Sequence, residues 1–433
     1  MTTTSDQPAA ARVTPVARLL PPALGRDFRW LWASSTASNL GDGLLLSAGP
    51  LLVTTITRDP VAVALATLMS FLPWVVFGIP GGALIDRVDR RRLSVMVNIA
   101  RALVLLVLTA TIVTGTASLP VILASLLVLG TAEMFADNTG SALLATHVPK
   151  EHLGVANSRL TGTRILTNDL AGPPIGAILI GLGLAVPFTV DAICALAAAF
   201  LVGRIAATPR PDPSTVERRH LRHEISDGVR WLWGHPPIRA LALTIFLFNV
   251  TFWAPYSLYV LYATERLGLD DLGYGVLITA GALGGLAGSI AYPTLERRFA
   301  LATLMRVGLL LETVTHLILA VSTSALVVGA TMTLFGIHAV VWGTTSTTVR
   351  QRAVPSAYLG RVTSVYMLLN VGGAAIGSIL GGLIAQQLGI VAPFWFAFIG
   401  SAVLLLVIWR TLDDIAHAPI ADDAVPEPVA EHG

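Results

Sequence analysis

Acidic side chains inside long apolar stretches are the residues of this 433-residue chain most able to do chemistry. An acid at mid-bilayer costs about 2.5–3.5 kcal/mol on insertion scales, so each one should have a partner or a purpose. Burial favours the protonated form of a carboxyl group, which is the property that a proton carrier needs. We rank Asp42 first as a proton-coupling residue, followed by Glu133 and Asp169. Structural hydrogen bonding between helices is the alternative role for each of them.

Two of the acids have a basic residue nearby on the same predicted helix. Glu312 and His316 are four residues apart and share one helix face, so we interpret them as a structural pair. Arg164 and Asp169 are five residues apart, which is a poor geometry for an ion pair on an α-helix. If these two do pair, Asp169 is structural rather than proton-coupling.

The composition places these acids in a helical membrane protein. Of the residues, 54% are hydrophobic and 12% are charged, about half of the roughly 25% charge typical of soluble domains. Apolar runs of about 20 residues recur, each long enough to cross a bilayer. The single cysteine, Cys194, excludes an internal disulfide framework and a cysteine-based metal site. No metal-ligand cluster, nucleophile–base pair or Walker loop is evident, so neither an enzyme nor ATP hydrolysis is expected.

The apolar pattern predicts an all-α polytopic protein with twelve membrane spans in two pseudo-symmetric six-helix bundles. The first bundle, 28–206, contains spans near 28–55, 62–85, 93–115, 119–146, 157–182 and 186–206. The second, 238–411, contains spans near 238–264, 273–293, 302–322, 325–348, 360–387 and 392–411.

Three polar segments flank and join these bundles. They are an N-terminal tail (1–27), a linker (207–237) and an acidic, Ala/Pro-rich tail (412–433) that we expect to be disordered. The later part of the linker, Glu224 to Trp233, is predicted to form an amphipathic helix on the membrane surface.

A repeat relates the two halves. Val148-Pro149 followed by Leu153-Gly154 recurs as Val354-Pro355 followed by Leu359-Gly360. Such a repeat predicts parallel halves related by an axis along the membrane normal.

Arginine placement sets the orientation. With both termini in the cytoplasm, the outside loops receive only Arg58 and Arg266. The cytoplasmic loops receive the other loop cations, namely Arg87, Arg90, Arg91, Arg92, Lys150, the Arg218 cluster, Arg297, Arg298, Arg350 and Arg352. We therefore predict a multi-pass protein of the cell membrane with cytoplasmic termini.

A charged loop joins the second and third predicted spans. It matches the pattern Gly, three residues, Asp-Arg, two residues, Arg, through Gly82, Asp86, Arg87, Arg90 and Arg91. This loop resembles the signature loop of the major facilitator superfamily of secondary transporters. Asp89 stands where many members carry glycine.

The charges of this loop suggest a gate. An aspartate at a helix end can accept bonds from a neighbouring helix N-terminus, and such contacts bias an equilibrium between two conformations. The resemblance implies that Asp86 docks at the start of the eleventh span, near Arg361. It also implies that Arg90 meets an acid on the fourth span, for which Asp137 is the candidate. Simple anchoring of the cytoplasmic side by arginines is the alternative.

A second motif lies in the fifth predicted span, where Gly172-Pro173-Pro174-Ile-Gly176 is similar to the Gly-Pro-x-x-Gly signature of exporters in the superfamily. Gly172 and Gly176 share one face and permit close helix approach, whereas Pro173 interrupts the backbone ladder and predicts a kink. Plain helix packing is the alternative role. Leu40-Gly41-Asp42, the charged loop at Asp86, and Val-Pro-Lys-Glu-His-Leu followed by Ala156-Asn157 also resemble one branch, which contains enterobactin-exporter-like proteins and actinobacterial efflux permeases.

Candidate substrate contacts lie on the seventh and eleventh spans. Asn249, Trp253 and Tyr256 share a helix face, and Met367 and Asn370 are candidates for the same cavity. Aromatic rings with a few polar groups suit an amphipathic ligand, although an interfacial aromatic belt is the alternative.

These features predict proton-coupled efflux, by an antiporter with alternating access, of a small amphipathic molecule such as a drug, siderophore or secondary metabolite. The proton gradient would supply the energy without any bound cofactor or metal. The expected partners are the lipid bilayer and the substrate, without nucleic acid, and the resemblance implies a monomer. The alternatives are an uptake permease for a small metabolite and a transport-inactive membrane sensor.

Overall fold

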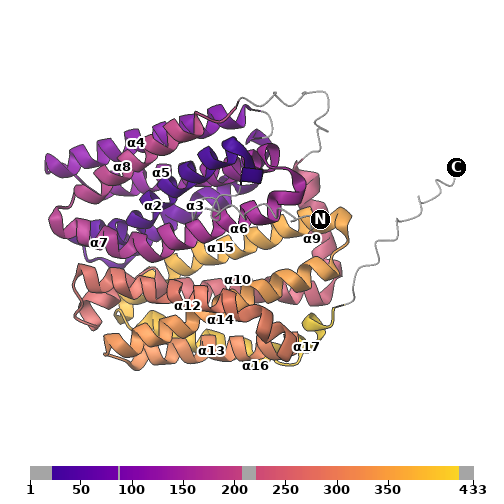
Figure 1. The fold of residues 1–433 in the computed structure, drawn as a ribbon. Coiled ribbons are helices and arrows are strands. Elements are labelled where there is room, and N and C mark those ends of the chain that lie inside the picture. The colour runs from indigo at the N-terminus through magenta and orange to yellow at the C-terminus, as the bar shows by residue number, and fades with distance from the viewer. Residues whose placement is uncertain (1–21, 86–87, 207–220, 419–433) are drawn as a thin grey trace, which may run out of the picture.

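The computed structural model describes residues 22–85, 88–206 and 221–418, and every regular element in these ranges is a helix, as predicted (Figure 1). The first half contains η1 (Pro22–Leu24), α2 (Gly25–Ile56), α3 (Pro60–Ile85), α4 (Arg90–Val113), α5 (Leu119–His147), η2 (Lys150–His152), α6 (Leu153–Arg164), η3 (Ile165–Ala171), α7 (Gly172–Leu182) and α8 (Val186–Val202). The rest contains α9 (Leu221–Gly234), α10 (Pro236–Tyr256), α11 (Tyr259–Leu261), η4 (Tyr262–Arg266), α12 (Asp271–Arg298), α13 (Leu301–Val321), α14 (Ala325–Ala353), α15 (Ser356–Leu388), α16 (Ala392–Ile408) and α17 (Thr411–Ala416).

Within the described ranges, nine helices are long and apolar enough to cross a membrane. Two further helices, α8 and α16, are apolar but only 17 residues long. The 32-residue α2 carries polar side chains through its middle, including Asp42. The predicted spans coincide with these helices to within a few residues. The fifth and seventh spans also contain π-helical segments, which the sequence did not predict.

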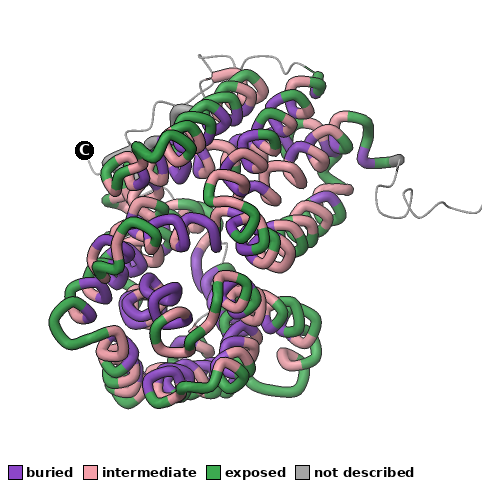
Figure 2. Tube along the Cα trace, turned by 90° about the vertical axis from the view of Figure 1, so that its left-hand side faces the viewer, coloured by how far each residue is buried: buried purple, intermediate pink, exposed green. Residues whose placement is uncertain are grey.

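The outer surface of the molecule is apolar. Exposed residues follow the outward faces of the helices (Figure 2) and include Leu406, Ile290 and Val107, which are 79%, 72% and 59% exposed. Because a soluble monomer rarely exposes large apolar patches, this surface fits contact with lipid tails.

The helices form two groups, which we call the N-terminal bundle (α2–α8) and the C-terminal bundle (α10–α16) (Figure 1). The helices α9 and α17 lie at one end of these bundles, and we call it the α9 end. The opposite end, where α2 finishes and α3 begins, is called the far end.

The later part of the predicted linker is helical, as expected, and packs on α15. A Cβ atom built on Gly228 of α9 would lie 2.8 Å from the carbonyl oxygen of Arg361, so the two backbones are in close contact. Trp231 stacks on His235 at 3.7 Å between ring centroids and also contacts Tyr358. The helix α9 is therefore attached to the C-terminal bundle.

The two bundles meet at the far end, along a surface that we call the seam. There, α3 packs on α15 and α7 packs on α12. The hydrogen bonds and ion pairs that join described residues of the two bundles all lie at this end. They are Thr67 to the Ser257 carbonyl at 3.5 Å, Thr279 to the Leu170 carbonyl at 3.3 Å, Gln386 to Asp59 at 3.2 Å, and Arg58 to Glu265 at 3.6 Å. The structure is therefore closed at the far end.

Candidate functional site

The buried charges of the N-terminal bundle converge on Arg101 of α4. Its side chain is 1% exposed and forms a hydrogen-bonded ion pair with Asp42 of α2. Its Nη1 donates to Ser38 Oγ at 2.7 Å, and the Ser38 hydroxyl donates in turn to Asp42 Oδ2 at 3.4 Å. Asp191 of α8, fully buried, has a carboxylate oxygen 3.8 Å from Arg101 Nη2. Asp42 thus shares one arginine with a second aspartate.

Asp191 and the role of Arg101 were not predicted from the sequence. A signal existed, because Asp191 is the one charged residue within the apolar helix α8. Both of its carboxylate oxygens are buried and neither has a hydrogen-bond partner among the described residues. A buried, unpartnered carboxylate is expensive, so its position next to Arg101 needs a functional explanation.

Two glycines beside Asp42 allow this arrangement. A Cβ atom on Gly41 would lie 2.9 Å from Asp191 Cγ, and one on Gly43 would lie 2.6 Å from the carbonyl oxygen of Asn168. Since any side chain at these positions would overlap its neighbours, the small residues let α2 approach both α8 and η3. The Leu40-Gly41-Asp42 motif therefore places a carboxyl group in a tightly packed site.

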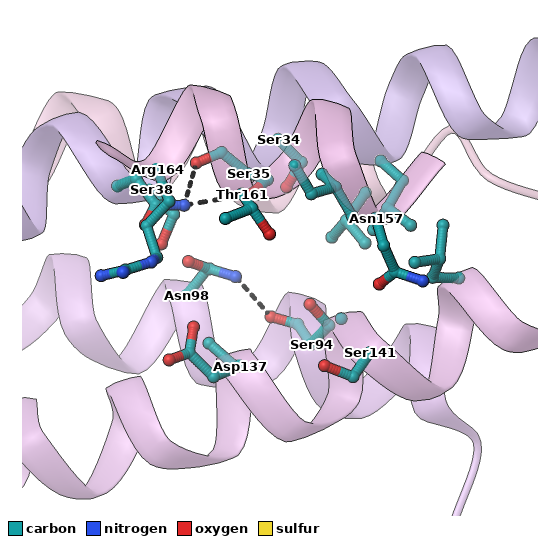
Figure 3. Close-up of a pocket in the computed structure, with 17 residues that line it drawn as sticks. Ser34, Ser35, Ser38, Ser94, Asn98, Asp137, Ser141, Asn157, Thr161 and Arg164 are labelled. Atoms are coloured by element: carbon teal, nitrogen blue, oxygen red, sulfur yellow. Dashed lines mark hydrogen bonds between the residues drawn. The ribbon is translucent and has the colours of Figure 1, made fainter. Parts of the chain in front are cut away.

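A polar cavity of about 270 Å³ leads towards Asp42 from the α9 end (Figure 3). All of its lining residues belong to the N-terminal bundle. The polar ones are Ser34, Ser35, Ser38, Asn39, Ser94, Asn98, Asp137, Ser141, Asn157, Thr161 and Arg164. Ser38, which contacts both Asp42 and Arg101, marks its inner limit. Of the two aspartates beside Arg101, Asp42 has an 11% exposed side chain and Asp191 a 0% exposed one.

Two further predicted acids lie on α5 beside this cavity. Glu133 is half-buried and interacts electrostatically with Asp42, Arg101 and Asp191. Asp137 points into the cavity (Figure 3), and no described basic nitrogen lies within 4.0 Å of its carboxylate. Three carboxyl groups, those of Asp42, Asp191 and Glu133, therefore lie near the one guanidinium of Arg101, and a fourth, that of Asp137, lines the cavity.

The charged loop is described only in part. Asp86 and Arg87 lie outside the described residues, and for Gly82 only its place in α3 is known. Arg90 reaches the fourth span, as the resemblance implied, but its Nη1 donates to Thr146 Oγ1 at 3.1 Å. The expected partner, Asp137, lies more than two helical turns further along α5, too far for an arginine at the start of α4 to pair with it.

Two other residues that concern the predicted gate, one in the loop and one in α15, have clear contacts. Asp89 caps α4, because its Oδ1 accepts the backbone N–H of Arg92 at 3.1 Å. An acidic cap thus stands where many members of the family carry glycine. Arg361, the expected docking position for Asp86, pairs with Asp227 of α9 at 3.4 Å and stacks on Tyr358.

Asp169 pairs with Arg164 at 3.5 Å despite the unfavourable spacing. The reason is the π-helix η3, which begins directly after Arg164. In a π-helix the hydrogen bonds join residues five apart, so positions i and i+5 come to lie on one face. The expectation of poor geometry assumed an α-helix, and the observed pair gives Asp169 a structural partner.

The glycine motif packs directly on the helix that carries Asp42. A Cβ atom on Gly172 would overlap the backbone of Gly43, and one on Gly176 would lie 2.6 Å from Ser47 Oγ. Ser47 also donates to the carbonyl oxygen of Pro173 at 2.7 Å. The break in the ladder predicted at Pro173 takes the form of a π-helix followed by a new α-helix with proline in its first turn.

The aromatic residues predicted to contact the substrate, Trp253 and Tyr256, lie where the two bundles meet. Trp253 of α10 contacts Phe71 of α3 edge-to-face at 4.6 Å, and Tyr256 stacks on Phe252 at 4.9 Å. The side-chain amide of Asn249 instead donates to the Ile245 carbonyl of its own helix at 2.8 Å.

The two remaining candidate substrate contacts lie on α15. Met367 is 47% exposed and Asn370 is half-buried, one helical turn apart. Neither forms a hydrogen bond with Trp253 in the part of the chain that the structure describes.

The C-terminal bundle contains a buried group of its own. His316 Nε2 lies 2.9 Å from Glu312 Oε1, which is the predicted pairing, and His338 of α14 lies 3.6 Å from Oε2. A Cβ atom on Gly308 would lie 2.7 Å from His338 Nδ1, so the glycine makes room for this ring. In the part of the chain that the structure describes, no group of three or more ligands suits a metal ion.

The sequence and the fold can be compared with those of known proteins. The family model described as "transmembrane secretion effector" matches residues 19–429. The chain belongs to this family of the major facilitator superfamily. Proteins of this family are transporters and not enzymes, and the match confirms the superfamily resemblance drawn from the sequence.

Curated relatives and solved structures agree. The chain is 27% identical over 378 residues to the multidrug efflux pump Tap of Mycolicibacterium fortuitum, covering 84% of this chain and 90% of that protein. It is 23% identical over 391 residues to macrolide efflux protein A of Streptococcus pyogenes, covering 88% and 94%. A bacterial homologue of the iron transporter ferroportin, in its inward-facing state, superposes with a TM-score of 0.71 at 18% identity, covering 90% and 99%. The chain is therefore a membrane transporter.

Proposed function

We propose that this transporter exports a small amphipathic molecule across the cell membrane in exchange for protons. Twelve spans in two pseudo-symmetric bundles would alternate access to a site between them. The α9 end would face the cytoplasm, together with both termini, and the protein would act as a monomer.

The observation that carries proton coupling is the charge imbalance around Arg101. Asp42 and Asp191 share the guanidinium of Arg101 in a packed environment, and the half-buried Glu133 interacts with all three electrostatically. Three ionised carboxylates beside one cation leave uncompensated negative charge, which is strongly unfavourable when buried. Proton uptake relieves it, and of the two aspartates beside Arg101 it is Asp42 that is partly exposed and contacts Ser38, a residue that lines the polar cavity.

Export is supported by the relatives, two of which are named as efflux proteins. The Gly172–Gly176 motif, which is similar to an exporter signature, agrees with this direction. Its close contacts with α2 place the motif directly beside the proposed proton site.

The seam supports alternating access. Because the bundles are closed at the far end, the structure corresponds to a cytoplasm-open state in the proposed orientation. In this state the cavity that leads to Asp42 lies on the cytoplasmic side, where an exporter that exchanges its substrate for protons releases each proton.

The proposed substrate class is based on the candidate substrate contacts of α10 and α15. Trp253 and Tyr256 supply flat apolar surfaces, and Met367 and Asn370 supply a flexible apolar group and an amide. Such a surface suits an apolar or aromatic molecule with a few polar groups.

The proposal is tested in proteoliposomes of the purified protein with an imposed pH gradient. Erythromycin, tetracycline and ethidium serve as probes, and proton movement is followed with an internal pH-sensitive dye. We expect at least one probe to move against its gradient with opposite proton flux. Asp42→Asn should abolish this coupled movement, while Glu151→Gln, an exposed acid of the same bundle, should behave as wild type.

The outcomes separate the alternatives. Probe movement in the same direction as the protons would indicate an uptake permease. Binding of probes without any flux would indicate a sensor. Proton-driven export that persists in Asp42→Asn would remove Asp42 from the mechanism.

A further inference from the structure

We propose that Asp191 is the alternate partner of Arg101: when Asp42 takes up a proton, the guanidinium moves from Asp42 to Asp191. Asp191 is then a positioning residue that allows Asp42 to be neutralised without leaving a buried cation unpaired. This inference rests on the proposed proton coupling at Asp42, and it adds a residue to which no role has been assigned.

The geometry places both aspartates on the same guanidinium nitrogen. Nη2 of Arg101 contacts Asp42 Oδ1 and lies 3.8 Å from Asp191 Oδ1. A charge-assisted hydrogen bond has a length of about 2.7–2.9 Å, so a movement of roughly 1 Å would complete the second contact. Small rotations within the arginine side chain can provide such a movement without shifting a helix.

The carboxylate of Asp191 is placed to accept the guanidinium when Asp42 is protonated. Both of its oxygens lack a hydrogen-bond partner among the described residues, so they are free to accept the guanidinium. Its side chain is 0% exposed, whereas that of Asp42 is 11% exposed and accepts a hydrogen bond from Ser38, which lines the polar cavity, so protons reach Asp42 first. The absence of a side chain at Gly41 lets α2 pack directly against the Asp191 carboxylate, because a Cβ atom there would lie 2.9 Å from Asp191 Cγ.

The other charged groups around the site do not replace Asp191. The helix α7, which also packs on α8, carries no titratable side chain, and α8 itself contributes only the half-buried Cys194 besides Asp191. The remaining charged groups near the pair of aspartates are Arg101 from α4 and Glu133 and Asp137 from α5, and Asp137 interacts further out with Arg164 of α6, the partner of Asp169 in η3. Glu133 is the nearest rival, but it forms no ion pair within 4.0 Å of Arg101.

Without an alternate partner for Arg101, protonation of Asp42 would be energetically unfavourable. Removing one partner of a buried ion pair leaves the other charge uncompensated, which is strongly destabilising. With Asp191 available, the proton on Asp42 and the guanidinium on Asp191 leave both groups of the former pair satisfied. The exchange involves no covalent step, and the only species that crosses the site is the proton.

The direct test is the experimental structure of the full-length Asp42→Asn variant, in which an amide stands for the protonated acid. We expect the distance from Arg101 Nη2 to Asp191 Oδ1 to shorten from 3.8 Å to about 2.9 Å. Arg101 remaining on residue 42, or turning to Glu133, would overturn the inference. If that same variant still exports probes by proton exchange, the proposed function fails, whereas loss of coupling with an unmoved Arg101 refutes only the partner exchange.

A second measurement follows the protonation of Asp42 itself. Infrared difference spectra recorded over a pH series follow the carbonyl stretch of protonated carboxyl groups, and the Asp42 band is the one removed by Asp42→Asn. In Asp191→Asn we expect this band to reach half intensity about one pH unit or more below its wild-type value. Glu151→Gln serves as the control, and an unchanged midpoint in Asp191→Asn would contradict the inference.

Discussion

The seam between the bundles can be opened by a single methyl group at Gly275 of α12. A Cβ atom there would lie 2.8 Å from the carbonyl oxygen of Pro173, 2.9 Å from Ala177 Cβ and 3.1 Å from Pro174 Cα. Carbon atoms in ordinary contact are about 3.5–4.0 Å apart. Two of the three neighbours are backbone or ring-locked atoms that cannot rotate away. Gly275→Ala should therefore force α12 and α7 apart by about 0.5–1 Å.

The size of the effect follows from this overlap. Overpacking of this kind costs about 1–3 kcal/mol, and it acts only in the conformation that is closed at the far end. A difference of about 1.4 kcal/mol is tenfold in an equilibrium constant, so the ratio of far-end-open to far-end-closed protein should rise by roughly 5- to 150-fold. Gly281→Ala is the matched control, because it lies on the same helix and its nearest neighbour atom is 3.8 Å away.

The assay measures distances between spin labels on the two bundles. Labels at Thr116→Cys and Thr323→Cys, in a Cys194→Ser background, report the separation of exposed far-end loops from the two bundles. Gly275→Ala should increase the population with a long far-end distance, and Gly281→Ala should match the parent protein. Identical distance distributions in the two variants would refute the idea that this glycine contact holds the far end closed.

Three further predictions concern stability and binding. Gly176→Ala should lower the thermal unfolding temperature relative to Gly181→Ala, because the first Cβ meets Ser47 Oγ at 2.6 Å and the second meets nothing within 4 Å; equal temperatures would argue against tight packing of α7 on α2. Glu312→Ala should destabilise the protein by about 3 kcal/mol, measured by thermal unfolding in detergent, since it leaves two buried histidines without their carboxylate. Trp253→Ala should raise the KM for an aromatic probe about five- to tenfold, from the loss of roughly 1 kcal/mol of ring contact, and an unchanged KM would place the substrate elsewhere.

The helical class was predictable because it depends on local sequence. Apolar runs of membrane-spanning length identify helices without any knowledge of their partners, and the structure places helices at each predicted span. The pairing of Glu312 with His316 was predictable for the same reason, since i and i+4 are neighbours on any α-helix.

Contacts between helices were harder to predict. Asp42 and Arg101 lie 59 residues apart, and nothing in the sequence indicates that α2 and α4 place these two side chains together. Asp191 was overlooked because a single acid in an apolar helix gives no hint of its partner. The π-helix at Ile165–Ala171 was not predicted because the expected helices have 3.6 residues per turn, and for the same reason the spacing of Arg164 and Asp169 indicated a poor geometry for an ion pair.

The π-helix η3 connects the proposed proton site at Asp42 with the seam through direct contacts. On one side, its residue Asn168 presents a carbonyl oxygen to Gly43, the neighbour of Asp42. On the other side, Leu170 accepts a hydrogen bond at 3.3 Å from Thr279 of α12, and Pro173 contacts Gly275 immediately after η3 ends. π-helical segments are irregular and often occur at functional sites. A change of charge at Asp42 that shifts α2 would therefore press first on η3, the segment against which the opposite bundle is seated. A physical link of this kind is what coupling between proton binding and rocking of the bundles requires.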